Sequence, residues 1–141
     1  MKQTIRSTVS ILLSLVLLLC IVSCNTVEKT GVWENATYRK DMEFGEGSKT
    51  VVVEVTAEEQ TVTFTVHTDK DTVGAALLEH GLIAGDQGDY GLYVKVVNGI
   101  IADYDVDQSY WAFYINGEYA MTGVDATEIT EGATYRLAYT K

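Results

Sequence analysis

One short stretch, Ser109 to Met121, limits the fold of this chain more than any other. It is rich in aromatic residues and contains one strong turn signal, the dipeptide Asn116-Gly117. A two-residue type I′ turn needs positive φ at both central residues, and asparagine and glycine accept that backbone with the least strain. The stretch therefore predicts an antiparallel hairpin that turns at Asn116 and Gly117.

The first arm of this hairpin has two different faces, because side chains alternate along a strand. One face carries Trp111, Phe113 and Ile115, and the other carries Tyr110, Ala112 and Tyr114. A packed sheet needs one apolar face, so the tyrosine face is available for recognition. Tyrosine is also common on strands because it fits a half-buried pleated surface. Sheet filling and a ligand platform are therefore both open interpretations.

The N-terminal residues have the layout of a secretory signal. Lys2 and Arg6 give a positive start, an apolar run extends from Val9 to Val22, and polar sequence begins at Asn25. A helix over this run would rise about 21 Å, which is short of the roughly 30 Å hydrocarbon core of a bilayer. We therefore expect a signal peptide in preference to a membrane span.

The end of the apolar run, Ile21-Val22-Ser23-Cys24, resembles the bacterial lipoprotein box. That resemblance implies a lipoprotein signal peptide over residues 1–23 and a lipid on Cys24, the new N-terminus. Cys20 fits less well, because the preceding Leu19 is not small. An ordinary signal peptide and an uncleaved anchor are the alternatives. We expect the domain on the outer face of the cytoplasmic membrane, touching it only through this lipid, with no possible internal disulfide.

The chain is strongly acidic, with a formal net charge of −10 that becomes more negative once Lys2 and Arg6 are removed. Binding to nucleic acid, or lying flat on an anionic membrane, requires a basic patch that this sequence lacks. We therefore expect no nucleic-acid partner and a monomeric soluble domain.

Residues 24–48 are predicted to be a polar tether, because they show no sustained period of 2 or 3.6. Trp33, Tyr38 and Phe44 are apolar enough that part of the tether is expected to lie back on the domain. The folded domain is predicted to span residues 49–141.

Alternation of apolar residues predicts two strands at the start of this domain. The first carries Val51, Val53 and Val55, and the second carries Val62, Phe64 and Val66. The polar connection of about four residues between them, 57–60, is typical of an antiparallel hairpin.

A helix of about ten residues is predicted next, because the apolar period changes. Val73, Ala76, Leu77 and His80 form one stripe. Residues 69–72 offer N-caps, and Gly81-Leu82 is typical of a glycine C-cap.

A glycine-rich loop is expected over residues 85–91, followed by a strand at 93–97, a turn at Asn98-Gly99 and a last strand at 134–139. The order of strands and helix predicts an α+β fold: a small β-grasp-like domain with two antiparallel hairpins and one crossing helix.

Catalytic residues are not evident in this sequence. Ser48 and Ser109 lie in no nucleophile motif, and neither His67 nor His80 has an orienting partner suggested by spacing. We therefore expect that the protein is not an enzyme.

The acidic run around Asp103, Asp105 and Asp107 begins like a calcium loop. An EF-hand would require glycine and glutamate where this chain has Gln108 and Tyr114, so the motif fails. An irregular calcium site and a solvated edge that discourages strand pairing are both open. We predict no metal site.

Several segments together resemble the C-terminal β-domain of the transcobalamin and intrinsic-factor proteins. They are Tyr90 to Val94, Val97 to Ile100, Ser109 to Tyr114, Asn116 to Glu118, Gly123, Gly132 and the closing strand to Tyr139, together with Thr72 to Leu78. More closely, the mature chain is similar to small bacterial lipoproteins that carry this transcobalamin-like domain, a family of unknown function. The resemblance covers roughly Lys49 to Lys141.

The resemblance implies that this domain forms one of two walls around cobalamin. In the vitamin carriers two segments of the wall face the corrin, and they match Asp89 to Val94 and Trp111 to Ala120 here. The carriers close the site with a large helical barrel, which this chain lacks. Phe113 and Tyr114 also make the second segment more aromatic here, so a different ligand or a protein groove is open.

We therefore expect a lipid-anchored module on the cell surface that binds cobalamin, another corrinoid or a different small planar ligand. A module for protein interaction or adhesion, with a surface protein as partner, is the alternative. Apart from the lipid, no covalently bound cofactor is expected. The predicted ligand-binding residues are Tyr90, Gly91, Tyr93, Trp111, Phe113, Asn116, Gly117 and Glu118.

Overall fold

Two strands with strict alternation form the centre of the structure, a computed structural model that describes residues 31–141. β2 (Lys49–Ala57) and β3 (Gln60–Thr68) pair antiparallel over their whole length. The side chains that they bury are valines, Ala57, Phe64 and Thr68, none more than 2% exposed. The predicted first hairpin is confirmed. The signal peptide, Cys24 and the start of the tether lie outside the described residues.

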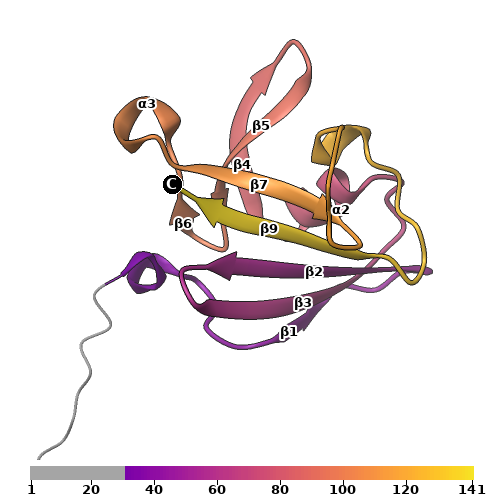
Figure 1. Ribbon diagram of the computed structural model, residues 1–141. Coiled ribbons are helices and arrows are strands. Elements are labelled where there is room, and N and C mark those ends of the chain that lie inside the picture. The colour runs from indigo at the N-terminus through magenta and orange to yellow at the C-terminus, as the bar shows by residue number, and fades with distance from the viewer. Residues whose placement is uncertain (1–30) are drawn as a thin grey trace, which may run out of the picture.

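Four further strands extend this hairpin into a six-stranded sheet of order β1-β3-β2-β9-β7-β8 (Figure 1). They are β1 (Met42–Phe44), β7 (Tyr110–Ile115), β8 (Glu118–Tyr119) and β9 (Thr134–Thr140). The β1–β3 and β2–β9 pairs are parallel, and the others are antiparallel. The sheet is therefore mixed.

A second, three-stranded antiparallel sheet has the order β4-β5-β6. Its strands are β4 (Ile83–Gly88), β5 (Gly91–Val97) and β6 (Ile100–Ile101). The predicted loop over residues 85–91 is wrong, because most of it is strand. A bulge between Ala84 and Gly85 brings the Gly85 backbone against the carbonyl of Tyr93, where no other residue would leave room for its Cβ.

The predicted helix is confirmed as α2 (Val73–Glu79), although it is shorter than expected. Thr72 caps its start, because its hydroxyl accepts a hydrogen bond from the Ala75 amide at 3.2 Å. At its end Gly81 takes a φ of +64°, and the Leu82 amide donates to the Leu77 carbonyl at 3.0 Å. This is the C-terminal geometry that glycine permits.

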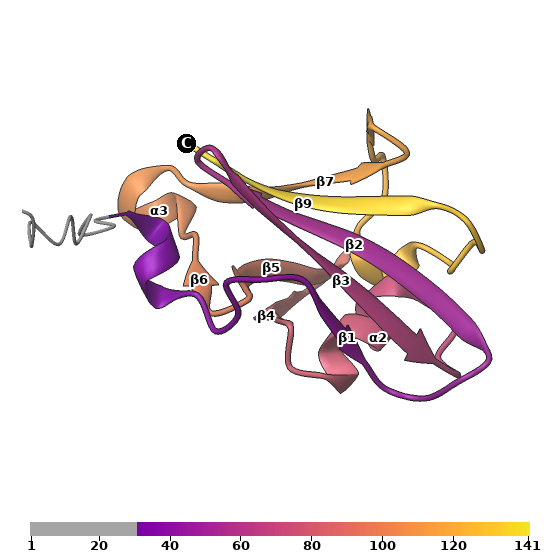
Figure 2. The ribbon, with the colours of Figure 1, turned by 90° about the horizontal axis from the view of Figure 1, so that it is seen from below.

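Figure 2 shows two layers. α2 and the β4–β6 sheet lie on one side of the six-stranded sheet, and the core is between the layers. The remaining helical elements are single turns: η2 (Val32–Asn35), α3 (Tyr104–Asp107) and η3 (Val124–Ala126). Within residues 31–141, no helix is both long and apolar enough to cross a membrane.

The segment 31–48, assigned to the tether from the sequence, is part of this fold. Trp33 is 3% exposed, and its Nε1 donates to the carbonyl of Ala57 at 2.8 Å. Tyr38 and Phe44 pack edge-on against Phe64, with ring centroids 5.8 and 5.6 Å apart. The segment supplies both a strand for the edge of β3 and aromatic rings for the core.

The predicted fold class, a small α+β β-grasp-like domain of two hairpins and one crossing helix, is wrong. The described chain is mostly strand, arranged as one six-stranded mixed sheet and a second three-stranded sheet. The expectation failed because β1, β4, β6 and β8 are too short or too polar to show a period of two. The parallel pairs also join segments that are far apart in the chain.

Candidate functional site

The tip of the β4–β5 hairpin presents two tyrosines. Tyr90 is fully exposed and Tyr93 is 47% exposed. They border a shallow cavity of about 220 Å³. Its lining consists of consecutive residues: Gly88, Asp89, Tyr90, Gly91, Leu92 and Tyr93. The turn requires glycine at Gly91, where φ is +104°.

The loop after β8 connects the two hairpins. At one end, the Ala120 amide donates to the carbonyl of Phe113 at 2.9 Å. At the other, a carboxylate oxygen of Asp125 in η3 accepts from the Leu92 amide at 2.8 Å. The loop therefore fixes the base of the β4–β5 tip relative to β7. The sequence contained no signal for Asp125.

We expect Asp125→Ala to lower the free energy of unfolding by about 1–2 kcal/mol, because the half-buried Leu92 amide would lose its acceptor. Thermal melts would measure the change. Asp125→Asn is the matched control, since its amide oxygen can still accept this hydrogen bond. Equal stability of the alanine and wild-type chains would show that Asp125 does not hold the tip.

The β7–β8 turn matches its prediction. Asn116 and Gly117 have φ values of +49° and +83°, and the Asn116 Oδ1 accepts from the Thr134 amide at 3.0 Å. Gly117 and Glu118 are exposed. Tyr119 and Met121, which were not predicted as site residues, are also exposed, at 60% and 95%.

Trp111 and Phe113 lie in the hydrophobic core, each 8% exposed. Trp111 packs edge-on against Tyr139 at 5.6 Å, and Phe113 stacks on Tyr135 at 6.2 Å. The structure thus supports the core interpretation of these two residues. The other predicted residues form two groups at the surface: Tyr90, Gly91 and Tyr93 at one turn, and Asn116, Gly117 and Glu118 at the other. All are exposed except Gly91, which is half-buried. The loop from Ala120 to Asp125 connects the two groups.

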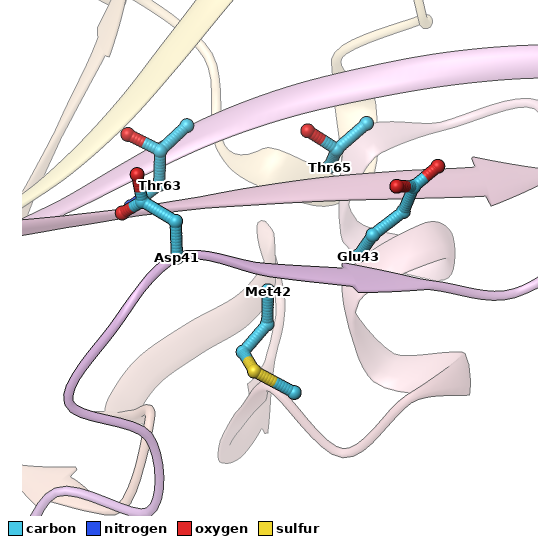
Figure 3. Close-up of a pocket in the computed structure, with 5 residues that line it drawn as sticks. All are labelled: Asp41, Met42, Glu43, Thr63 and Thr65. Atoms are coloured by element: carbon cyan, nitrogen blue, oxygen red, sulfur yellow. The ribbon is translucent and has the colours of Figure 1, made fainter.

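A second cavity, of about 270 Å³, lies at the β1 edge of the large sheet (Figure 3). Asp41, Glu43, Thr63 and Thr65 point to one side of the sheet, whereas Met42 points to the other. Asp41 accepts from the Thr63 amide at 2.8 Å, and Glu43 pairs with His67 at 2.6 Å. This edge lies within the tether predicted over residues 24–48, where no sequence signal indicated a cavity.

A third cavity, of about 460 Å³, is lined by Thr37, Tyr38, Arg39, Lys40 and Met42. In the part of the chain that the structure describes, no three His, Cys, Asp or Glu side chains are grouped to hold a metal ion.

The acidic run Asp103 to Asp107 is not an extended edge, because it forms the one-turn helix α3 beside the C-terminus (Figure 1). Asp103 caps this turn by accepting from the Asp105 amide at 3.1 Å. The pKa of Asp107 is held below its usual value of 3.8. The largest cause is the hydrogen bond from the Ser109 hydroxyl, and the second is the hydrogen bond from Lys141. These contacts engage Asp103 and Asp107 in structural hydrogen bonds.

The depressed pKa of Asp107 predicts a loss of stability in acid. The ionised Asp107 carboxylate contributes fully to the stability of the fold above the pKa that Asp107 has in the unfolded chain. This contribution is lost as the pH falls through the lower pKa of the folded state. We expect melting temperatures to fall as the pH drops below about 4, partly for this reason. Ser109→Ala should make the fall shallower. Thr61→Ala is the control, because Thr61 on β3 pairs with Thr56 and makes no hydrogen bond to Asp107, so the shape of its pH profile should not change. Identical profiles for Ser109→Ala and wild type would exclude this linkage.

The family described as Domain of unknown function (DUF4430) matches residues 70–141, half of the chain. This chain belongs to that family. The DUF4430 match begins just before α2 and includes both hairpins that carry the predicted site.

Two solved structures are similar to this DUF4430 chain. A Ruminococcus gnavus protein, described as a candidate metal-binding protein, has 29% sequence identity and a TM-score of 0.62, covering 67% of this chain and 98% of its own. Haptocorrin, solved in complex with Cbi, has 17% identity and a TM-score of 0.53, covering 70% of this chain and 26% of its own. The haptocorrin match confirms the transcobalamin-like resemblance in fold. The comparison with curated proteins finds no match.

Proposed function

We propose that this DUF4430 chain is a binding module that holds a small planar ligand at the β4–β5 tip and the loop after β8. The proposal rests on two exposed tyrosines, Tyr90 and Tyr93, which border the cavity at this tip. Asp125 holds the base of the tip through the hydrogen bond that it accepts from the Leu92 amide. Exposed aromatic rings on a fixed turn can stack on a flat ligand with little loss of conformational freedom. The amides of the glycine-rich turn can donate hydrogen bonds.

The proposed ligand is cobalamin or another corrinoid. Haptocorrin, a structural neighbour, was solved with Cbi bound. The transcobalamin resemblance implies that Asp89 to Val94 faces the corrin. This segment overlaps the lining of the cavity at the tip. A cavity of about 220 Å³ encloses only part of such a ligand, and the match spans 26% of the haptocorrin chain. A second wall, supplied by another protein, is therefore part of the proposal.

The proposed test is an absorbance titration of cobalamin with the protein. A spectral shift that saturates is expected, and Tyr90→Ala or Tyr93→Ala should raise the Kd at least tenfold. Tyr104→Ala is the matched control, because Tyr104 is similarly exposed, at 56%, on α3.

The corrinoid would be rejected as the ligand if the spectrum did not change and if cobalamin passed freely through an equilibrium-dialysis membrane in the presence of the protein. The alternative function is a protein-interaction module, which would use the exposed side chains of Tyr90, Tyr119 and Met121. Large aromatic and methionine side chains are typical of interface hot spots.

We further propose that the module is non-catalytic and is anchored by a lipid on Cys24 at the outer face of the cytoplasmic membrane. The support is the sequence from Ile21 to Cys24. Mass spectrometry of the mature protein should find a lipidated N-terminal Cys24, and Cys24→Ala should abolish that species. A mature chain with another N-terminus and no lipid would contradict the anchor.

A further inference from the structure

Two asparagine-glycine turns of this chain have nearly the same backbone. The φ values are +52° and +78° at Asn98 and Gly99, and +49° and +83° at Asn116 and Gly117. This dipeptide is chemically labile, because glycine has no Cβ to hinder attack of its amide nitrogen on the asparagine side chain. Since the two turns share one chemistry and one backbone shape, their surroundings decide which of them reacts.

The turn at Asn98 is locked. Asn98 is 1% exposed, its Oδ1 accepts from the Tyr38 amide at 2.8 Å, and its Nδ2 donates to the Tyr38 carbonyl at 2.7 Å. Gly99 is packed as well, since an added Cβ would lie 2.6 Å from the carbonyl oxygen of Asn35. Both reacting groups are therefore held in place and sheltered from water.

The turn at Asn116 is open to water. Asn116 and Gly117 are exposed, and an added Cβ at Gly117 would meet no atom within 4 Å. Among the described residues, neither the Asn116 Nδ2 nor the Gly117 amide has a hydrogen-bond partner. The one contact of this side chain is the 3.0 Å hydrogen bond that its Oδ1 accepts from the Thr134 amide. A donor at that oxygen stabilises the negative charge that develops there when the side-chain carbonyl is attacked.

The strand that follows this turn is weakly held. β8 has two residues, and its register partners on β7 are Tyr114 and Ile115. Both residues of β8 are exposed. Segments with so few contacts open locally without unfolding of the whole domain. Such opening gives the Gly117 nitrogen the freedom to reach the side-chain carbon of Asn116.

We propose that Asn116-Gly117 is a site of spontaneous deamidation. The Gly117 amide nitrogen loses its proton to solvent and bonds to Cγ of Asn116. The bond from Cγ to Nδ2 breaks, and the amino group takes up a proton and leaves as ammonia. The resulting cyclic imide then adds one water molecule at either of its carbonyl carbons, which yields aspartate or isoaspartate. Water is the only co-reactant, and no electrons are exchanged.

The isoaspartyl product changes the fold locally. Its backbone runs through the former Cβ, so one more backbone atom separates residues 116 and 117. A two-residue turn has no room for this atom, so β8 separates from β7. The Ala120 amide then loses its 2.9 Å hydrogen bond to the Phe113 carbonyl. The loop after β8 also fixes the β4–β5 tip, so weaker binding of the tip's ligand should follow. That last consequence rests on the proposed function, whereas the deamidation does not.

The test incubates the full chain, folded or unfolded in urea, in mildly alkaline buffer made with ¹⁸O-water. Mass spectrometry of chymotryptic peptides separates the two turns, because aromatic residues lie between them. In the folded chain Asn116 is expected to convert at least tenfold faster than Asn98, with one ¹⁸O atom incorporated and isoaspartate among the products. In urea the two rates should be similar, because both turns then lose their surroundings.

Two variants complete the test. Asn116→Gln should abolish the conversion, because its longer side chain does not form the five-membered ring. Asn116→Asp carries the charge of the product on an unaltered backbone. Hydrogen exchange at the Ala120 amide should be at least tenfold faster in the isoaspartyl chain than in Asn116→Asp, and thermal melts verify that both are folded.

Three outcomes would overturn the proposal. The first is a folded chain in which Asn116 stays intact, or converts no faster than Asn98, while the chain in urea converts at both. The second is conversion to aspartate alone, which indicates direct hydrolysis without the cyclic imide. The third is equal exchange at Ala120 in the isoaspartyl chain and in Asn116→Asp, which would show that β8 stays paired. A failed cobalamin titration would not affect these results, since no ligand takes part in them.

Discussion

Replacing Trp111 with alanine is expected to lower the free energy of unfolding by about 3–5 kcal/mol, the usual cost of removing a large buried aromatic side chain. Trp111 is 8% exposed, belongs to the main hydrophobic cluster and packs against Tyr139. The melting temperature should fall by about 10 °C or more. Phe113→Ala should behave similarly, because Phe113 is equally buried and stacks on Tyr135.

Tyr114→Ala is the matched control, since Tyr114 is the neighbouring aromatic residue on the opposite, partly exposed face of β7. Its expected effect on stability is smaller. A Trp111→Ala chain with an unchanged melting temperature would contradict the core assignment. If such a chain also lost cobalamin binding, Trp111 would belong to a ligand platform.

Removing all residues before Lys49 is expected to leave a chain that does not fold stably. The truncation deletes β1 and η2, and with them Trp33, Phe44 and the strand that covers the edge of β3. Phe64 would lose its edge-on contacts with Tyr38 and Phe44. Circular dichroism and thermal melts would measure the outcome against a chain that begins at Thr30.

Trp33→Ala tests the same segment with a single change, and we expect it to cost about 3–5 kcal/mol. Trp33→Phe is the control, because it keeps an aromatic ring in the core but removes the indole N–H that donates the 2.8 Å hydrogen bond to the Ala57 carbonyl. Its expected cost is about 1–2 kcal/mol. A truncated chain that melts at the same temperature as the longer chain would show that residues 31–48 contribute nothing to the fold.

The β4–β5 tip depends on both local and long-range contacts. A glycine-rich turn exposes its tyrosines, and Asp125, more than 30 residues later in the chain, holds the backbone at its base.

The sequence by itself determined the local elements whose geometry depends on neighbouring residues. Asn98-Gly99 and Asn116-Gly117 specify turns with positive φ at both positions, and both turns are present. Thr72 and Gly81 specify the ends of α2 through short-range hydrogen bonds. Alternation on β2, β3 and β7 specifies which residues face the core, because a strand has a period of two.

Only the tertiary structure decided how these elements assemble and which aromatic residues stay at the surface. The parallel pairing of β1 with β3 and of β2 with β9 joins distant segments, and no local pattern encodes it. β4 appeared to be a loop because its residues are small and polar, yet pairing with β5 makes it a strand. Trp111 became a core residue, and Tyr90 an exposed one, because the β4–β6 sheet covers one face of β7 and leaves its own tip free. Burial depends on such long-range packing, so the sequence indicated which residues could bind a ligand but not which of them remain exposed.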